Sequence, residues 1–187
     1  MKVLLIDFYD SFTYNIFHYL ESLGADVTVW EDCKVEIDLV AQFDCIVFSP
    51  GPGLPKDTKS LFPVLKQYEK SKKILGVCLG MQGIAEFYGA KLYNQKEVKH
   101  GVSEKMSCLN KSKLFLNLPK EFEVGLYHSW AIELIEDLEI IPIGISENKV
   151  IMAIEHVKLP IYGVQFHPES ILTPFGKDIL RNFLFSC

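Results

Sequence analysis

A cysteine between two glycines is the residue of this sequence best suited to chemistry. Cys78 stands in the pattern Gly76-x-Cys78-x-Gly80, directly after a short apolar run. The pattern is the thiol counterpart of the G-x-S-x-G turn, which holds a serine nucleophile between a strand and a helix. The dipole of the following helix favours a thiolate over a thiol. A buried structural cysteine in a strand-to-helix turn shows the same five residues, so the pattern alone leaves both interpretations open.

A thiol nucleophile needs a base, and the base needs a group that orients it. Of the five histidines, His167 is in the best setting, because it follows an apolar run in FHPES and Glu169 stands two residues later. Both side chains can then point into one cleft, where His167 takes the thiol proton and Glu169 fixes its tautomer. Taken alone, HPE is better explained as an ordinary loop. His100 and His128 are the alternative bases.

A third element is the loop SPGPGLP at residues 49–55, which follows the apolar run CIVFS. Its glycines and prolines make a stiff loop with exposed backbone N–H groups, and such a loop can supply a donor to an oxyanion. A plain tight turn is the alternative. The loop is not a phosphate-binding loop, because no Gly-Lys-Ser/Thr follows.

These residues require a sheet that places the ends of several strands together. The first half alternates short apolar runs with helix-like segments, which predicts parallel strands covered by helices on both faces. The second half reads as consecutive strands, which predicts a small antiparallel or mixed extension. We therefore expect an α/β fold with a mostly parallel open sheet, as one domain over residues 1–187. The predicted strands are 3–6, 26–30, 45–49, 74–77, 97–107, 122–126, 130–135, 140–146, 150–156 and 161–166; the predicted helices are 12–23, 35–42 (weak), 59–69, 79–88 and 175–185.

Composition argues against several classes of function. The net charge of −5 provides no basic surface for nucleic acid, and Lys70–Lys73 is the only dense basic run. No segment has the ~20 apolar residues that cross a bilayer, and the N-terminus reads as a strand rather than a signal peptide. The five cysteines form no disulfide-like pattern and no metal-ligand spacing. We expect a cytoplasmic protein without a metal site.

Taken together, the motifs resemble class I glutamine amidotransferase domains, which have a flavodoxin-like sheet, over nearly the whole chain. The matching segments, in order, are DFYDSFTYN at 7–15, SPGPG at 49–53, GVCLGMQ at 76–82, KHG at 99–101, YHSW at 127–130 and GVQFHPES at 163–170. The DSFTYN segment and the chain length are similar to those of the small subunits (component II) of anthranilate synthase and aminodeoxychorismate synthase.

The resemblance implies a role for each matching residue. Cys78 attacks the side-chain amide of L-glutamine, His167 protonates the leaving ammonia and Glu169 orients His167. The remaining implied positions are the oxyanion donors Gly51 and Leu79, the glutamine-holding residues Gln82, Ser129 and Trp130, and the loop residues Pro52 and Gly53. No cofactor is implied for this chain, and any Mg²⁺ belongs to the partner synthase.

The resemblance also implies a partner, a large chorismate-using synthase subunit (component I) that receives the ammonia. Anthranilate synthase is favoured over aminodeoxychorismate synthase, and service to both is open. A free-standing cysteine hydrolase and a catalytically silent regulatory subunit are the competing hypotheses. The sequence departs from the family pattern at Met81, Leu126 and Phe8. None of the three is in the triad, but we expect Phe8 and Leu126 to alter partner contacts or activation. Phe8, Tyr9 and Phe12 are aromatic residues suited to an interface core, and the alternative is that they pack under the first helix.

Overall fold

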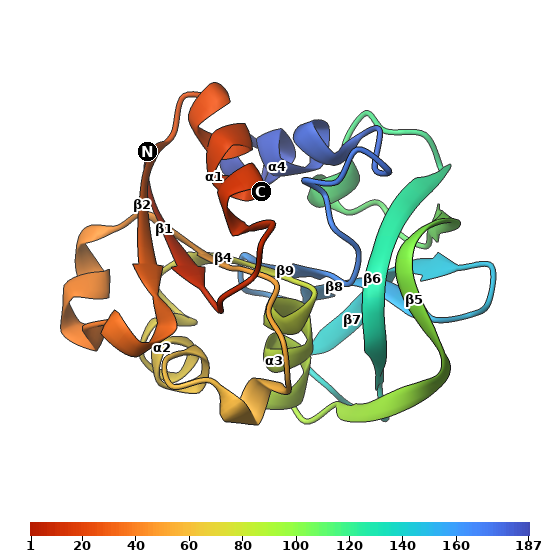
Figure 1. Cartoon of the computed structure of the whole chain (residues 1–187), viewed down its shortest axis with the longest axis horizontal. Helices are drawn as coiled ribbons and strands as arrows, with labels where there is room; N and C mark the ends of the chain where they lie inside the picture. Colours follow the sequence, from red (N-terminus) through yellow and green to blue (C-terminus); the bar gives the residue numbers. More distant parts are fainter.

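The computed structural model describes residues 1–187, apart from the side chains of residues 96–98, and places nine strands in one mixed sheet (Figure 1). The strand order is β2-β1-β3-β4-β9-β8-β7-β5-β6. The strands are β1 (Lys2–Asp7), β2 (Asp26–Glu31), β3 (Cys45–Phe48), β4 (Lys73–Val77), β5 (Lys91–Cys108), β6 (Glu121–Glu133), β7 (Ile140–Ser146), β8 (Ile151–His156) and β9 (Ile161–Val164). The helices are α1 (Thr13–Ser22), α2 (Leu61–Tyr68), α3 (Leu79–Phe87) and α4 (Gly176–Phe185).

The first five strands in this order are parallel, as the alternating pattern predicts. Figure 1 shows α1 and α4 on one face of the sheet and α2 and α3 on the other. Two hydrophobic cores follow from this, one containing Ile16 and Leu180 and the other containing Leu65 and Ile84. The central strands are short and apolar because both of their faces are covered. The predicted α/β fold is confirmed.

The antiparallel extension begins where β8 pairs with β9 and continues through β7 to the long β5–β6 hairpin. The sequence predicted separate strands at 122–126 and 130–135, but β6 runs unbroken through the polar residues between them. Cross-strand pairing is the reason, because Tyr127 and His128 pair with His100 and Lys99. Likewise β5 begins at Lys91, earlier than predicted, and register shifts let the hairpin bend.

Two predicted helices differ from the observed ones. The segment at 35–42 forms a 3₁₀ helix (Ile37–Gln42), and α2 begins at Leu61 instead of residue 59. The later start has a local cause, since the buried carboxylate of Asp32 accepts hydrogen bonds from the backbone N–H groups of Lys59 and Ser60, both at 2.8 Å. Within the described part of the chain, every helix is too short or too polar to cross a membrane.

Candidate active site

Cys78 occupies the turn between β4 and α3 in a backbone conformation that non-glycine residues rarely adopt. Its φ is 51° and its ψ is −103°. The turn is held at both ends, because the Cys78 N–H donates to the carbonyl of Val164 on β9 (2.8 Å) and the Cys78 carbonyl accepts from the Gln82 N–H (3.0 Å). Backbone strain of this kind persists only where the surroundings enforce it, and it is common at nucleophiles.

The two glycines of the motif are required for packing. A Cβ atom added to Gly80 would lie 2.6 Å from the Cβ of Phe48 on β3, and one added to Gly76 would overlap the backbone of Gly80. The helix can therefore approach the sheet closely enough to form the turn only when both positions lack a side chain. The spacing Gly76-x-Cys78-x-Gly80 thus specifies the tight turn that places Cys78 at the end of β4.

His167 and Glu169 form a buried pair beside this turn. His167 Nδ1 lies 2.7 Å from Glu169 Oε1, and the two side chains are 2% and 0% exposed. The backbone of His167 is equally constrained: its N–H donates to the carbonyl of Gly125 (3.0 Å), and its carbonyl accepts from the Thr173 hydroxyl (2.7 Å). The ring therefore has one orientation, in which Nδ1 serves Glu169 and Nε2 remains for another partner.

The charge of His167 depends on opposing effects. Burial disfavours the imidazolium, but interactions with the Cys78 side chain and the Glu169 carboxylate outweigh burial and raise the pKa of His167 to about 10. Nε2 of His167 makes no hydrogen bond within the described residues, even though Cys78 is near enough to affect its pKa. The raised pKa favours a protonated imidazole beside Cys78, and its Nε2 carries the proton that can be transferred.

Two aromatic rings hold the imidazole. The ring centroids of Phe12 and Tyr127 lie 5.6 and 4.9 Å from that of His167, and the Tyr127 hydroxyl lies 3.1 Å from the Ser170 hydroxyl. Phe12 precedes α1 and Tyr127 is on β6, so the site is assembled from segments that are far apart in sequence. Sequence reasoning assigned Phe12 to an interface and gave Tyr127 no separate role.

The loop after β3 brings Gly51 against the start of α3. A Cβ atom added there would lie 2.7 Å from Leu79 Cδ2, so Gly51 lies directly against the first residue of α3. The N–H of Leu79 has no acceptor one turn earlier, because helices leave their first N–H groups unpaired. Pro52 and Gly53 are exposed, and Gly53 has the positive φ of 79° that favours glycine.

The remaining predicted residues lie on α3 and β6. Gln82 Nε2 donates to the Trp130 carbonyl (3.0 Å) and to Gln165 Oε1 (3.1 Å), and Ser129 is partly exposed next to Trp130. Sequence reasoning missed Gln165, whose Nε2 lies 3.5 Å from Cys78 Sγ. The available signal was its place two residues before His167, where alternation along an extended segment puts both side chains on one side.

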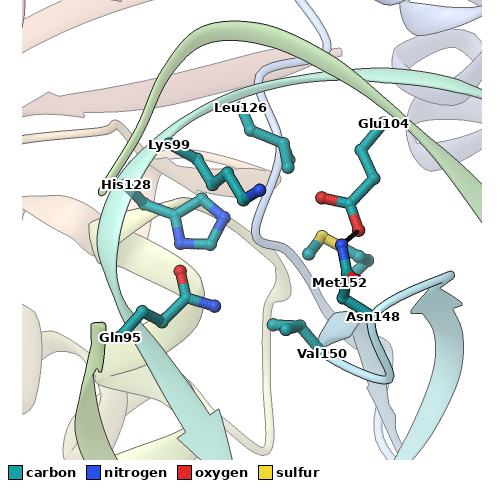
Figure 2. Close-up of a pocket in the computed structure, with 8 residues that line it drawn as sticks. All are labelled: Gln95, Lys99, Glu104, Leu126, His128, Asn148, Val150 and Met152. Carbon is teal, nitrogen blue, oxygen red and sulfur yellow. Dashed lines mark hydrogen bonds between the residues drawn. The ribbon is translucent and has the colours of Figure 1, made fainter. Parts of the chain in front are cut away.

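The two alternative histidines are unsuited to act as the base. His128 follows Tyr127 on β6 and points to the opposite face, where it lines a cavity of about 170 Å³. Figure 2 shows its ring among the side chains that line this cavity. Its Nδ1 lies 2.9 Å from the Trp130 carbonyl, and burial lowers the pKa of His128 to about 4. His100 packs on Tyr127, with ring centroids 5.4 Å apart, whereas His167 packs on the same ring at 4.9 Å and also pairs with Glu169.

The two family departures that were expected to alter partner contacts or activation are both buried. Phe8 is 2% exposed and stacks on Phe48, and Leu126 is fully buried, so neither residue can contact a partner directly. Only Phe8 was expected in an interface core, because the sequence does not show which face of a segment is covered; an effect of either residue on activation stays a prediction. The surface near the site instead carries Tyr9 and Ile171, which are 54% and 94% exposed. Met81 is buried and packs against Gly163.

Comparisons with known proteins agree with the geometry. The family model "Glutamine amidotransferase class-I" matches residues 4–187. The chain is 42% identical over 187 residues to "Putative anthranilate synthase component II" of Haemophilus influenzae, covering 98% of this chain and 96% of that protein. It is 37% identical to "Aminodeoxychorismate/anthranilate synthase component 2" of Bacillus subtilis, covering 97% and 95%. A solved structure of a "putative gmp synthase subunit a protein" from Thermoplasma acidophilum superimposes with a TM-score of 0.89 at 27% identity, covering 98% and 92%.

Proposed function

Because the chain belongs to the class I glutamine amidotransferases, we propose that Cys78, His167 and Glu169 release ammonia from L-glutamine for a chorismate-using synthase subunit. The observation that carries this proposal is the strained Cys78 at the end of β4, next to a charged His167 that Glu169 orients at 2.7 Å. Such a thiol and imidazole are suited to acyl transfer from an amide.

In the first half of the reaction, the Cys78 thiolate attacks the side-chain carbonyl carbon of glutamine. Negative charge develops on the carbonyl oxygen, and the N–H groups of Gly51 and Leu79 are the proposed donors to it. Nε2 of His167 gives its proton to the departing nitrogen, so that ammonia leaves and a glutamyl thioester remains. The raised pKa of His167 supports this order, because the ring already holds the proton that ammonia needs.

In the second half, neutral His167 takes a proton from water, and the resulting hydroxide attacks the thioester. The thiolate is restored, and the new carboxyl group carries the hydroxide hydrogen and releases it to solvent as glutamate leaves. His167 now holds a proton from water in place of the one that left with ammonia, so the site is back in its starting state. Glu169 stays ionised and stabilises the imidazolium in both halves, which is the usual role of the carboxylate in such a triad.

We propose that three residues hold the α-amino and α-carboxylate end of the glutamine substrate: Gln82, Ser129 and Trp130. Both hydrogens of the Gln82 amide already point at internal acceptors, the Trp130 carbonyl and Gln165. Gln82 Oε1 is therefore the atom that can meet the substrate, and a carbonyl oxygen suits the α-ammonium group. Pro52 and Gly53 are proposed to shape the rim of the site.

Anthranilate synthase is the partner that we favour, and aminodeoxychorismate synthase, or service to both, is the alternative. The names of the Haemophilus and Bacillus relatives support this range, since one refers to anthranilate synthase and the other to both synthases. We place the partner's contact surface around Ile171 and Tyr9, which border the site and are exposed. The five free cysteines support a reducing, cytoplasmic setting.

The decisive experiment reconstitutes the chain separately with each large subunit from the same organism and measures product from chorismate with either glutamine or an ammonium salt. We expect glutamine-dependent product with the anthranilate subunit, and a glutaminase rate that rises when the subunit binds. Product only with the aminodeoxychorismate subunit would select the alternative. No glutaminase activity with either subunit would support a silent regulatory chain, and a full rate without any subunit would support a free-standing hydrolase.

A further inference from the structure

Gln165 is a buried polar side chain that contacts the Cys78 sulfur. It is fully buried directly after β9, and its Nε2 lies 3.5 Å from Cys78 Sγ. Its backbone is constrained on both sides: the Gln165 N–H donates to the Met152 carbonyl (2.8 Å), and the preceding Val164 carbonyl accepts from the Cys78 N–H (2.8 Å). The amide is thus held next to the sulfur by the sheet itself.

A chain of hydrogen bonds determines which end of the Gln165 amide faces the sulfur. The Trp130 carbonyl can only accept, so the NH₂ group of Gln82 must point at it (3.0 Å). The same NH₂ group then lies 3.1 Å from Gln165 and needs an oxygen there. Gln165 Oε1 therefore faces Gln82, and the NH₂ group of Gln165 faces Cys78. Because a backbone carbonyl anchors the chain, the amide orientations cannot reverse.

An N–H group aimed at sulfur stabilises a thiolate more than a thiol, because hydrogen bonds to a charged acceptor are stronger. A primary amide cannot take the thiol proton, so Gln165 does not compete with His167. We propose that Gln165 is a positioning residue that holds Cys78 in the thiolate form and orients its sulfur, and that Gln82 maintains the amide of Gln165 in the required orientation. This inference rests on the proposed role of Cys78 as the nucleophile.

The arrangement also connects substrate binding to the nucleophile. Gln82 is a proposed contact of glutamine, and its amide orients the group that donates to Cys78. A substrate that shifts Gln82 therefore changes the hydrogen bond at the sulfur through one intervening side chain.

The test is the pH dependence of Cys78 alkylation by iodoacetamide, measured on the full chain and mapped by peptide mass. All variants carry Cys33→Ser, which removes the exposed thiol. Burial raises the pKa of the Cys45 thiol, and it raises the pKa of the Cys108 and Cys187 thiols to about 11. These three thiols therefore react little near neutral pH. Gln165→Met removes the donor and keeps the length of the side chain. We expect the midpoint of the alkylation profile to rise by about one pH unit.

Gln165→Glu places a carboxylate near the sulfur and should raise the midpoint of the Cys78 alkylation profile further than Gln165→Met does. Gln82→Met removes only the amide that orients Gln165, so it should raise this midpoint less. Gln42→Met, at an exposed position, is the matched control and should leave it unchanged. An unchanged midpoint in Gln165→Met, at a native melting temperature, overturns the role of Gln165. If that variant does not fold, unchanged midpoints in Gln165→Glu and Gln82→Met overturn it. Failure of the unsubstituted Cys78 to react would instead overturn the nucleophile itself and, with it, this inference.

Discussion

His167 and Glu169 are two residues apart in sequence and form a buried pair, with Nδ1 and Oε1 2.7 Å apart and both side chains at most 2% exposed. Glu169 Oε2 has no hydrogen-bond partner within the described residues. A carboxylate with so little solvation depends on its partner for stabilisation. The pair therefore acts as a unit. Substitution of either residue should change the charge or the orientation of the imidazole that interacts with Cys78.

Cys78→Ser should reduce glutamine-dependent synthesis by about a thousandfold or more while ammonia-dependent synthesis by the partner subunit continues. The reason is that thiolate attack is needed only to release ammonia. The measurement compares both nitrogen sources in the reconstituted complex. Cys45→Ser, a buried thiol on β3, is the control and should retain glutamine-dependent activity. Wild-type glutaminase activity in Cys78→Ser would mean that the nucleophile lies elsewhere.

His167→Ala should lower the glutaminase kcat more than Glu169→Gln does, by roughly tenfold or more. The imidazole transfers two protons in each cycle, whereas the carboxylate orients it and stabilises its charge. The comparison is made on kcat at saturating glutamine, with melting temperatures as the control for folding. His128→Ala should leave a larger residual activity than His167→Ala, and the reverse ranking would identify His128 as the base.

The protonation states of the two buried histidines should differ at neutral pH. His167 should titrate near pH 10 and His128 near pH 4, as followed by NMR of the ring nitrogens. Because the pKa of His167 is raised above its ordinary value of 6.5, its contribution to stability is complete below pH 6.5 and is lost as pH rises toward 10. Cys78→Ala should lower the His167 midpoint, because one of the two groups that favour the imidazolium is removed. An unshifted midpoint would contradict the pairing of these side chains.

Gly80→Ala should destabilise the protein by about 1–3 kcal/mol and reduce glutaminase activity, because its Cβ would lie 2.6 Å from that of Phe48. Gly24→Ala is the informative comparison: it has a φ of 90° but no heavy atom within 4 Å of the added Cβ. It should cost about 1 kcal/mol from backbone strain and leave activity unchanged. Both costs are measured by urea unfolding, and equal activity in the two variants would remove the packing argument for the Cys78 turn.

Ile171→Asp should weaken activation by the large subunit without changing the melting temperature of the isolated chain. Ile171 is 94% exposed and lies two residues after Glu169, so a charge there can disturb an interface at little cost to the fold. Val157→Asp is the control, since Val157 is 48% exposed and follows β8 at the opposite end of the sheet from His167. Activation is read as glutaminase rate against added large subunit, and equal effects of both variants would argue against this contact surface.

Local patterns made much of the site predictable. His167 and Glu169 are two residues apart, and the pattern Gly76-x-Cys78-x-Gly80 spans five residues, so both motifs are visible in the sequence. The reason that Gly80 must lack a side chain is not local, because its neighbour is Phe48 on β3. The hairpin boundaries were not predictable in the same way. The polar residues Tyr127 and His128 interrupt the apolar pattern of β6, and only their pairing with β5 keeps them in a strand.

The sequence by itself determined the α/β class, the nucleophile turn, the histidine–carboxylate pair and the Gly51 loop, because each depends on short-range periodicity or on a motif of adjacent residues. Tertiary structure decided which side chains surround the sulfur. Gln165 meets Cys78 across 87 positions because β9 inserts next to β4, and Phe8 is buried rather than available to a partner because the loop after β3 covers it. Contacts of this kind follow from strand order and register, which are set by the whole sheet and by no single segment.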